Sequence, residues 1–132
     1  MRITADTNVL VRAVVVDDPA QSQAAIAALR GAEQIAVTVP ALCELVWVLR
    51  RVYAFPVAEI SAAIRALMEA GNVRLDRAAV EAGLGQLEAG GDFADAVIAH
   101  QGQWLGGVTF LSFDRQAVAL LQQRGIAAEL LI

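Results

Sequence analysis

RITADTNVLVRAVVV, residues 2–16, contains the abrupt change of pattern from which the predicted fold follows. Its first apolar run, Ile3–Ala5, predicts a buried strand, and its second, Val9–Val15, predicts a helix. Asp6, Thr7 and Asn8 lie between them, and all three residue types favour the start of a helix. A strand that leads directly into a helix is typical of α/β proteins.

The same alternation continues to residue 130. Further strands are predicted at Ile35–Val39, Asn72–Leu75, Val108–Phe113 and 126–130, and further helices at Pro19–Leu29, 40–55, Val57–Glu69, Arg77–Glu88, 92–104 and 115–124. This pattern predicts one α/β domain over residues 1–132, with a mostly parallel sheet and helices on both faces. In such sheets ligands bind at the carboxyl ends of the strands.

Composition limits the possible partners. Hydrophobic residues make up 58% of the chain, and the mean hydropathy is +0.56. No apolar run reaches the roughly 18 residues of a membrane span, so no membrane association is expected. The surplus of apolar side chains instead predicts a homodimer face or a groove for another chain.

Several classes of site are disfavoured by missing residue types. Cys43 and His100 are the only residues of their kinds, which argues against a disulfide or a zinc site and favours a reducing cytoplasm. Cys43 is expected in the core and His100 on a helix surface. All ten basic residues are arginine, so the lysine of a Walker A loop is absent. A net charge of −4 argues against bulk electrostatic binding of nucleic acid.

Acidic residues recur where ligands are expected. Asp6 and Asp114 each follow a predicted strand, and Glu44 lies early in the helix after the second strand. Asp92 and Asp95 are three residues apart and share the face of one helix start. Asp92 and Asp114 also have the simpler interpretation of helix N-caps, and Glu44 that of a favourable charge in a helix dipole.

Glu44 is the most informative of these acids. Its neighbours in ALCELVWVL are almost all apolar, which predicts a partly buried carboxylate in need of a partner. Oxygen-rich clusters with few nitrogen or sulfur ligands suit Mg²⁺ or Mn²⁺. Such a cation lowers the pKa of bound water and clamps a phosphate, as phosphodiester hydrolysis requires.

ADTNVLVR, ALCELVWVLRR, DFADAVIA and FLSFDR together resemble the four conserved stretches of PIN-domain ribonucleases, in particular VapC-type toxins of toxin–antitoxin pairs. The resemblance implies a three-layer fold whose five-stranded parallel sheet has the order 3-2-1-4-5. It implies a Mg²⁺-dependent or Mn²⁺-dependent endoribonuclease that leaves 5′-phosphate and 3′-hydroxyl ends. Its partners would be an RNA substrate, a cognate antitoxin and a second copy of the chain.

The resemblance also assigns roles to individual residues. Asp6, Glu44, Asp95 and Asp114 match the catalytic, metal-holding quartet, and Asp92 matches a less uniform extra acid. Thr7, Asn8 and Ser112 match polar positions that orient the acids.

Two other functions are compatible with parts of the pattern. A small metal-dependent phosphatase of the haloacid-dehalogenase type is disfavoured, because Asn8 replaces its second aspartate and its lysine is missing. A non-catalytic PIN-fold binding module is supported by the apolar composition and opposed by the intact quartet. The aromatic residues Trp47, Tyr53 and Phe55 fit either an ordinary core or a groove for an antitoxin helix.

Overall fold

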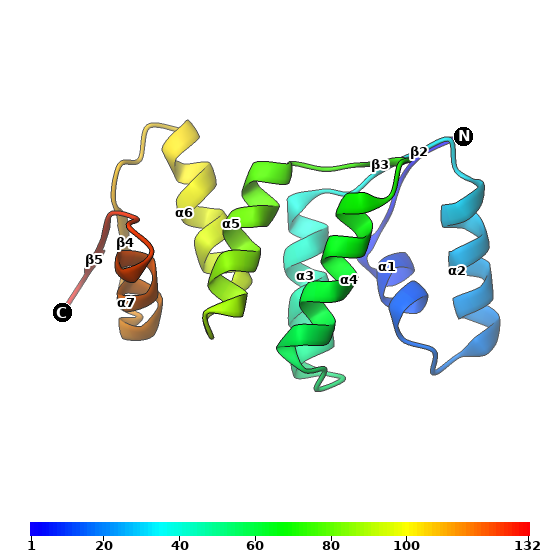
Figure 1. Cartoon of the computed structure of the whole chain (residues 1–132), viewed down its shortest axis with the longest axis horizontal. Coiled ribbons are helices and arrows are strands. Elements are labelled where there is room, and N and C mark those ends of the chain that lie inside the picture. Colours follow the sequence, from blue (N-terminus) through cyan, green and yellow to red (C-terminus); the bar gives the residue numbers. More distant parts are fainter. The chain divides into compact units, whose positions relative to one another are not determined.

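Seven helices and five short strands alternate in the computed structural model, which describes all 132 residues (Figure 1). The elements are β1 (Arg2–Thr4), α1 (Thr7–Val14), α2 (Pro19–Gly31), β2 (Gln34–Ala36), α3 (Val39–Arg51), α4 (Val57–Glu69), β3 (Val73–Arg74), α5 (Arg77–Glu88), α6 (Phe93–Trp104), β4 (Phe110–Ser112), α7 (Arg115–Gln123) and β5 (Ala128–Leu130). They form two compact units, Met1–Asp76 and Arg77–Ile132. The predicted α/β class is therefore confirmed.

The first unit contains a parallel three-stranded sheet of order β1-β2-β3. Ile3 of β1 lies opposite Ile35 of β2, and Ile35 lies opposite Val73 of β3. Helix α1 contacts both α2 and α3, and α3 and α4 lie side by side (Figure 1). The large side chains with almost no exposure in this unit are aliphatic: Leu10, Leu42, Leu45, Leu49, Ile60 and Ile64.

Capping residues start α2 and α3 of the first unit where the sequence favours it. The Asp18 carboxylate accepts a hydrogen bond from the Gln21 N–H (3.1 Å), and Pro19 begins α2. Thr38 caps α3 in the same way by accepting from the Ala41 N–H (3.3 Å). A proline in the first turn costs no intrahelical hydrogen bond, because that N–H has no partner there.

The second unit packs three helices with the parallel pair β4-β5. Gly83 of α5 faces the ring of Phe93 at the start of α6, and a Cβ on Gly83 would lie 2.6 Å from that ring. The absence of a side chain at Gly83 thus allows α5 and α6 to pack closely. Leu121 of α7 lies in a separate buried cluster with residues of α6 and β5.

All three helices of this unit end in the same glycine turn. Gly90, Gly106 and Gly125 have φ values of 97°, 92° and 78°. At the end of α5, the Gly90 N–H donates to the Leu87 carbonyl (3.1 Å) and the Gly91 N–H donates to the Gln86 carbonyl (2.8 Å). This is the Schellman pattern, which needs a residue in the left-handed region. It places Asp92 directly after the turn.

The predicted five-stranded sheet of order 3-2-1-4-5 is shown only in part. The order 3-2-1 is present in the three-stranded sheet of the first unit, and the order 4-5 is present in the two-stranded sheet of the second. The strand predicted at Val108–Phe113 is reduced to Phe110–Ser112. Strands of three residues form few ladder hydrogen bonds, and each bond contributes only about 1 kcal/mol net, so pairing alone holds short strands weakly.

No helix in the structure is both long enough and apolar enough to cross a membrane.

Candidate functional site

In the first unit, Asp6 and Glu44 follow the carboxyl ends of neighbouring parallel strands. Asp6 is the N-cap of α1, where its carboxylate accepts from the Thr7 N–H (2.9 Å). Glu44 lies in the second turn of α3, the helix that follows β2. Because β1 and β2 are parallel, their carboxyl ends lie at one edge of the sheet.

The expected partial burial of Glu44 is wrong, because its side chain is exposed. The buried face of α3 takes Leu42, Leu45 and Leu49, whereas Glu44 lies with the exposed residues Trp47 and Arg51. At 3.6 residues per turn, positions 44, 47 and 51 share one side of the helix. An apolar neighbourhood in sequence therefore overstated the burial of Glu44.

The polar residues beside Asp6 occupy different environments. Thr7 is buried, and its backbone N–H fixes the Asp6 carboxylate. Asn8 is exposed and lines an open pocket of about 390 Å³ together with Arg12 and Gln21.

In the second unit, Asp92 immediately precedes α6 and Asp95 lies in its first turn. Asp92 is the N-cap residue, yet its carboxylate forms no capping hydrogen bond. Asp95 is half-buried in the same turn. The N-cap position predicted for Asp92 is confirmed, but its carboxylate forms no capping hydrogen bond, so helix capping does not account for the charge.

Asp114 is the N-cap of α7, and its carboxylate accepts from the Ala117 N–H (3.0 Å). The Asp114 N–H in turn donates to the Ser112 hydroxyl oxygen (3.0 Å). Ser112 thus fixes the backbone at the end of β4, where Asp114 begins the next helix. The simpler interpretation of Asp114 as a helix cap agrees with this geometry, and it leaves the second carboxylate oxygen outside the cap.

The three acids of the second unit interact electrostatically. Burial, and then the negative charges of Asp92 and Asp114, raise the pKa of Asp95 from 3.8 to about 6. Like charges disfavour ionisation when they lie close together, so Asp92 and Asp114 lie near enough to Asp95 to add to the effect of burial. A cation between them would relieve the repulsion, and carboxylate oxygens are ligands that suit Mg²⁺ or Mn²⁺.

No group of three or more His, Cys, Asp or Glu side chains in the structure is arranged to hold a metal ion. The fit of the metal therefore rests on the donor chemistry and on the raised pKa of Asp95. Of the predicted acids, the structure brings Asp92, Asp95 and Asp114 into one electrostatic group.

The sequence interpretation missed two residues beside this group. Gln86 is fully buried in α5 and accepts a hydrogen bond from Arg124. A single glutamine on the otherwise apolar buried face of α5 was the available signal, because a buried amide needs partners.

His100 also differs from the expectation of a helix-surface residue. It is half-buried, and its Nε2 atom is buried without a hydrogen-bond partner.

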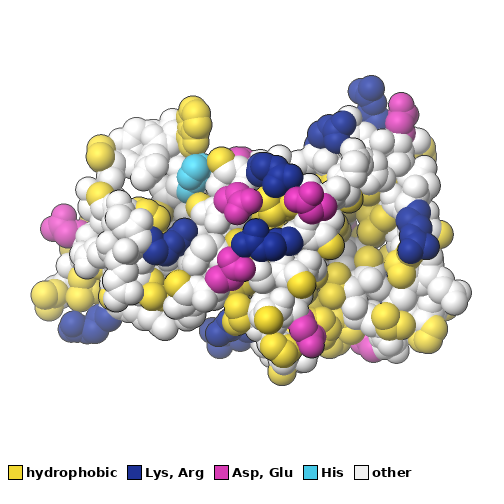
Figure 2. All heavy atoms as spheres, in the orientation of Figure 1, with side chains coloured by type: hydrophobic (Ala, Val, Ile, Leu, Met, Phe, Trp, Pro, Cys, Tyr) yellow, Lys and Arg dark blue, Asp and Glu magenta, His cyan; other side chains and the backbone are white.

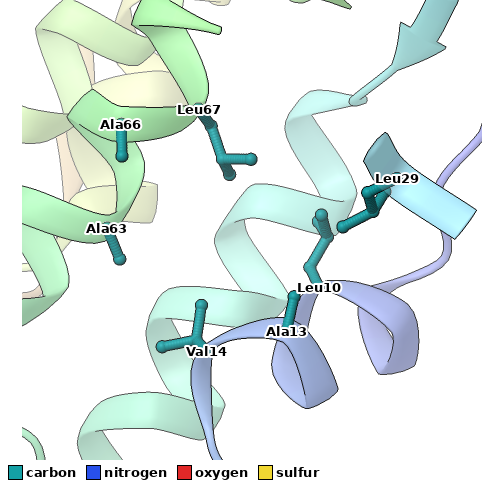
Figure 3. Close-up of a pocket in the computed structure, with 7 residues that line it drawn as sticks. All are labelled: Leu10, Ala13, Val14, Leu29, Ala63, Ala66 and Leu67. Atoms are coloured by element: carbon teal, nitrogen blue, oxygen red, sulfur yellow. The ribbon is translucent and has the colours of Figure 1, made fainter. Parts of the chain in front are cut away.

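An apolar groove lies on the first unit. A pocket of about 240 Å³ is lined by side chains of α1, α2 and α4: Leu10, Ala13, Val14, Leu29, Ala63, Ala66 and Leu67 (Figure 3). Figure 2 shows hydrophobic side chains gathered over α1 between α4 and α2.

Neither Trp47 nor Tyr53 is among the residues that line this groove. Trp47 is exposed on α3, whereas Tyr53 is half-buried, packs edge-on against Phe55 and donates a hydrogen bond to Asp17 (3.2 Å).

Acids placed after the strands of parallel sheets define the general class of this protein, an α/β protein with a candidate cation site. A comparison with known families identifies it further. Residues 3–120 match the PIN domain, and the chain belongs to this family. PIN domains are generally nucleases, often metal-dependent, which implies a nucleic-acid substrate. No curated protein matches the chain.

Proposed function

We propose that this chain is a Mg²⁺-dependent or Mn²⁺-dependent endoribonuclease. The observation that carries the proposal is the raised pKa of Asp95, about 6, which results first from burial of its carboxyl group and then from the negative charges of Asp92 and Asp114. Carboxylates held near one another without a neutralising partner destabilise the folded state. A bound cation would offset this destabilisation, which is typical of functional sites. Membership of the PIN family supports the same chemistry.

The proposed metal-holding residues are Asp6, Glu44, Asp95 and Asp114, with Asp92 as an additional acid. When bound, a divalent cation supplies Lewis acidity toward a phosphate oxygen and lowers the pKa of water. The chain's own residues fix the acids: the Thr7 N–H fixes Asp6, and the Ser112 hydroxyl fixes the backbone of Asp114. Asp95 holds a proton below about pH 6 and must lose it before it can act as a ligand.

We also propose that the protein acts in the cytoplasm as the toxin of a toxin–antitoxin pair. Support comes from the resemblance of four stretches to VapC-type toxins and from the groove between α1, α2 and α4. The groove is apolar along its whole lining, so it fits the apolar face of an antitoxin helix. Growth arrest after induction of the chain alone, absent for Asp95→Asn, is the expected cellular result; growth unaffected by the active chain would contradict the toxin role.

RNA cleavage by the purified chain tests the catalytic proposal. We expect cleavage in Mg²⁺ or Mn²⁺, products with 5′-phosphate and 3′-hydroxyl ends, and no cleavage with chelator. Asp95→Asn should lower the rate at least about 100-fold, because it removes one ligand charge at nearly constant shape. Glu33→Gln removes an exposed acid from the loop before β2 and serves as the matched control.

Wild-type protein that is folded but inactive with both metals would contradict the proposal and favour a non-catalytic PIN module. Equal activity of Asp95→Asn and Glu33→Gln would show that Asp95 is not a catalytic residue.

A further inference from the structure

Gln86 is a polar side chain with no exposure in the middle of the second unit. Its neighbours on the buried face of α5 are Val80, Leu84 and Leu87. Burial of an amide is unfavourable unless its donors and acceptors find partners. The contacts of Gln86 therefore indicate why an amide occupies a position that an aliphatic side chain would fill.

Two contacts fix the orientation of this amide. The Arg124 Nη1 donates to the Gln86 Oε1 (2.9 Å), and the Gln86 Nε2 donates to the Ala117 carbonyl through a long hydrogen bond (3.5 Å). Arginine has no acceptor, so the oxygen of the amide must face Arg124 and its nitrogen must face Ala117. A second donation from Arg124 to the Ala82 carbonyl (3.2 Å) holds the guanidinium in place.

Gly85 makes room for this arrangement. A Cβ at Gly85 would lie 2.3 Å from the Nη2 of Arg124. The guanidinium therefore lies against the backbone of α5, one residue before Gln86.

Gln86 contacts both turns that carry the acids: the turn before α6, which precedes Asp92, and the first turn of α7, which follows Asp114. The backbone carbonyl of Gln86 accepts from the Gly91 N–H (2.8 Å), which any residue at this position could do, and Asp92 follows Gly91. Its side chain reaches Ala117, whose N–H donates to the Asp114 carboxylate (3.0 Å).

The Gln86 side chain also packs closely against Gly91, the residue before Asp92. A Cβ on Gly91 would lie 3.0 Å from the Gln86 Cγ and 2.7 Å from a methyl group of Leu120. A further hydrogen bond joins the same two turns: the Gln116 side-chain amide donates to the Gly90 carbonyl (3.3 Å). The turn before α6 and the first turn of α7 are thus held together around one side chain.

We propose that Gln86 is a positioning residue that sets the spacing between the acid-bearing turns of α6 and α7, with Arg124 fixing its amide. This inference rests on the proposed function, because the spacing matters only if Asp92, Asp95 and Asp114 share a cation. Gln86 does not touch the cation; it acts through Gly91 and Ala117. Residues that orient metal ligands typically change affinity by about 10- to 100-fold when they are removed.

The test is the dissociation constant for Mn²⁺, measured by titration calorimetry on folded full-length protein. Gln86→Leu keeps the approximate volume and removes both amide contacts, and we expect Mn²⁺ binding at least about tenfold weaker than wild type. Val118→Ala truncates another buried side chain of the same unit, on α7. It should lower thermal stability as well but leave Mn²⁺ affinity within about twofold of wild type, because its side chain lies in the buried cluster formed with residues of α6 and β5.

Two glycine variants test the same inference without altering Gln86. Gly91→Ala should weaken Mn²⁺ binding, because its Cβ must displace Gln86 or Leu120. Gly102→Ala has nothing within 4 Å of the new Cβ and should bind Mn²⁺ as wild type does. If Gln86→Leu fails to fold, Arg124→Met provides the test. It keeps Gln86 but removes the donor that fixes its amide, and it should also weaken Mn²⁺ binding.

The outcomes separate the two proposals. Wild type that binds no Mn²⁺ would overturn the proposed function and this inference with it. Wild type that binds Mn²⁺, with Gln86→Leu and Gly91→Ala equally tight, would overturn the inference alone. Equal weakening in Gln86→Leu and Val118→Ala would also overturn it, because it would show only a general loss of core packing.

Discussion

The carboxyl group of Asp95 takes up a proton at a higher pH in the folded chain than in the unfolded chain. Its pKa is about 6 when folded, against 3.8 as the ordinary value. Between these values the folded state binds more protons, so stability falls as pH rises through this window and stays lower above it. A shift of two units corresponds to about 3 kcal/mol, and solvent screening of a half-buried group reduces this to about 1 kcal/mol.

Asp95→Asn should remove this pH-dependent cost in metal-free protein. We expect the variant and wild type to melt together near pH 4, and the variant to melt about 2–4 °C higher above pH 6.5. Thermal melts in chelator across pH 4–8 measure the difference, with Glu33→Gln, an exposed acid of the first unit, as the control variant. A variant that melts lower than wild type at pH 7 would instead make Asp95 a structural helix-start residue.

Residue types and their spacing could predict which acids of the second unit are candidate metal ligands, but not how exposed each of them is. Asp92 and Asp95 were identified by their spacing at a helix start. Their interaction with Asp114 depends on how α6 and α7 pack, which no local pattern contains. Glu44 shows the opposite failure, since its apolar sequence neighbours lie on the other side of α3.

At the scale of elements, the same acid can start a helix and belong to a site. Asp114 caps α7 through the Ala117 N–H, and it also contributes to the raised pKa of Asp95. Replacement by alanine removes the cap and the charge, whereas replacement by serine removes the charge and keeps a capping oxygen. Comparing the two variants therefore separates the roles.

Asp114→Ala should unfold about 1 kcal/mol more easily than Asp114→Ser, and both should lose RNA cleavage at least about tenfold. Urea unfolding in chelator measures the first difference, and a cleavage assay in Mn²⁺ measures the second. Full activity in Asp114→Ser would contradict a role for the carboxylate beyond capping.

The order of elements was predictable because strands and helices differ in length and in their boundary residues. Proline and aspartate marked the start of α2, and paired glycines marked the ends of α5 and α6. The first strand was predicted at its observed length of three residues, one position late, whereas the later strands were predicted too long: β2, β4 and β5 pair over only three residues. How far a strand pairs depends on its partner, which a single segment does not specify.

At the scale of the whole molecule, apolar side chains remain on the surface. Trp104, Leu105 and Val108, at the end of α6 and in the loop that follows, are each more than three-quarters exposed. Contiguous apolar residues of this size on a soluble surface commonly mark an interface. Together with a hydrophobic content of 58%, they favour self-association of the chain.

We therefore expect the 13.9 kDa chain to sediment as a dimer at micromolar concentration. Trp104→Gln removes the largest exposed side chain of this surface and should shift the equilibrium toward monomer, because buried apolar area contributes about 25 cal/mol per Å². Val16→Gln changes an exposed apolar residue of the first unit, in the α1–α2 loop, and should leave the equilibrium unchanged. Sedimentation equilibrium over a hundredfold concentration range measures both effects. A single species at the monomer mass throughout would contradict self-association, and a dimer that withstands Trp104→Gln but not Val16→Gln would place the interface on the first unit.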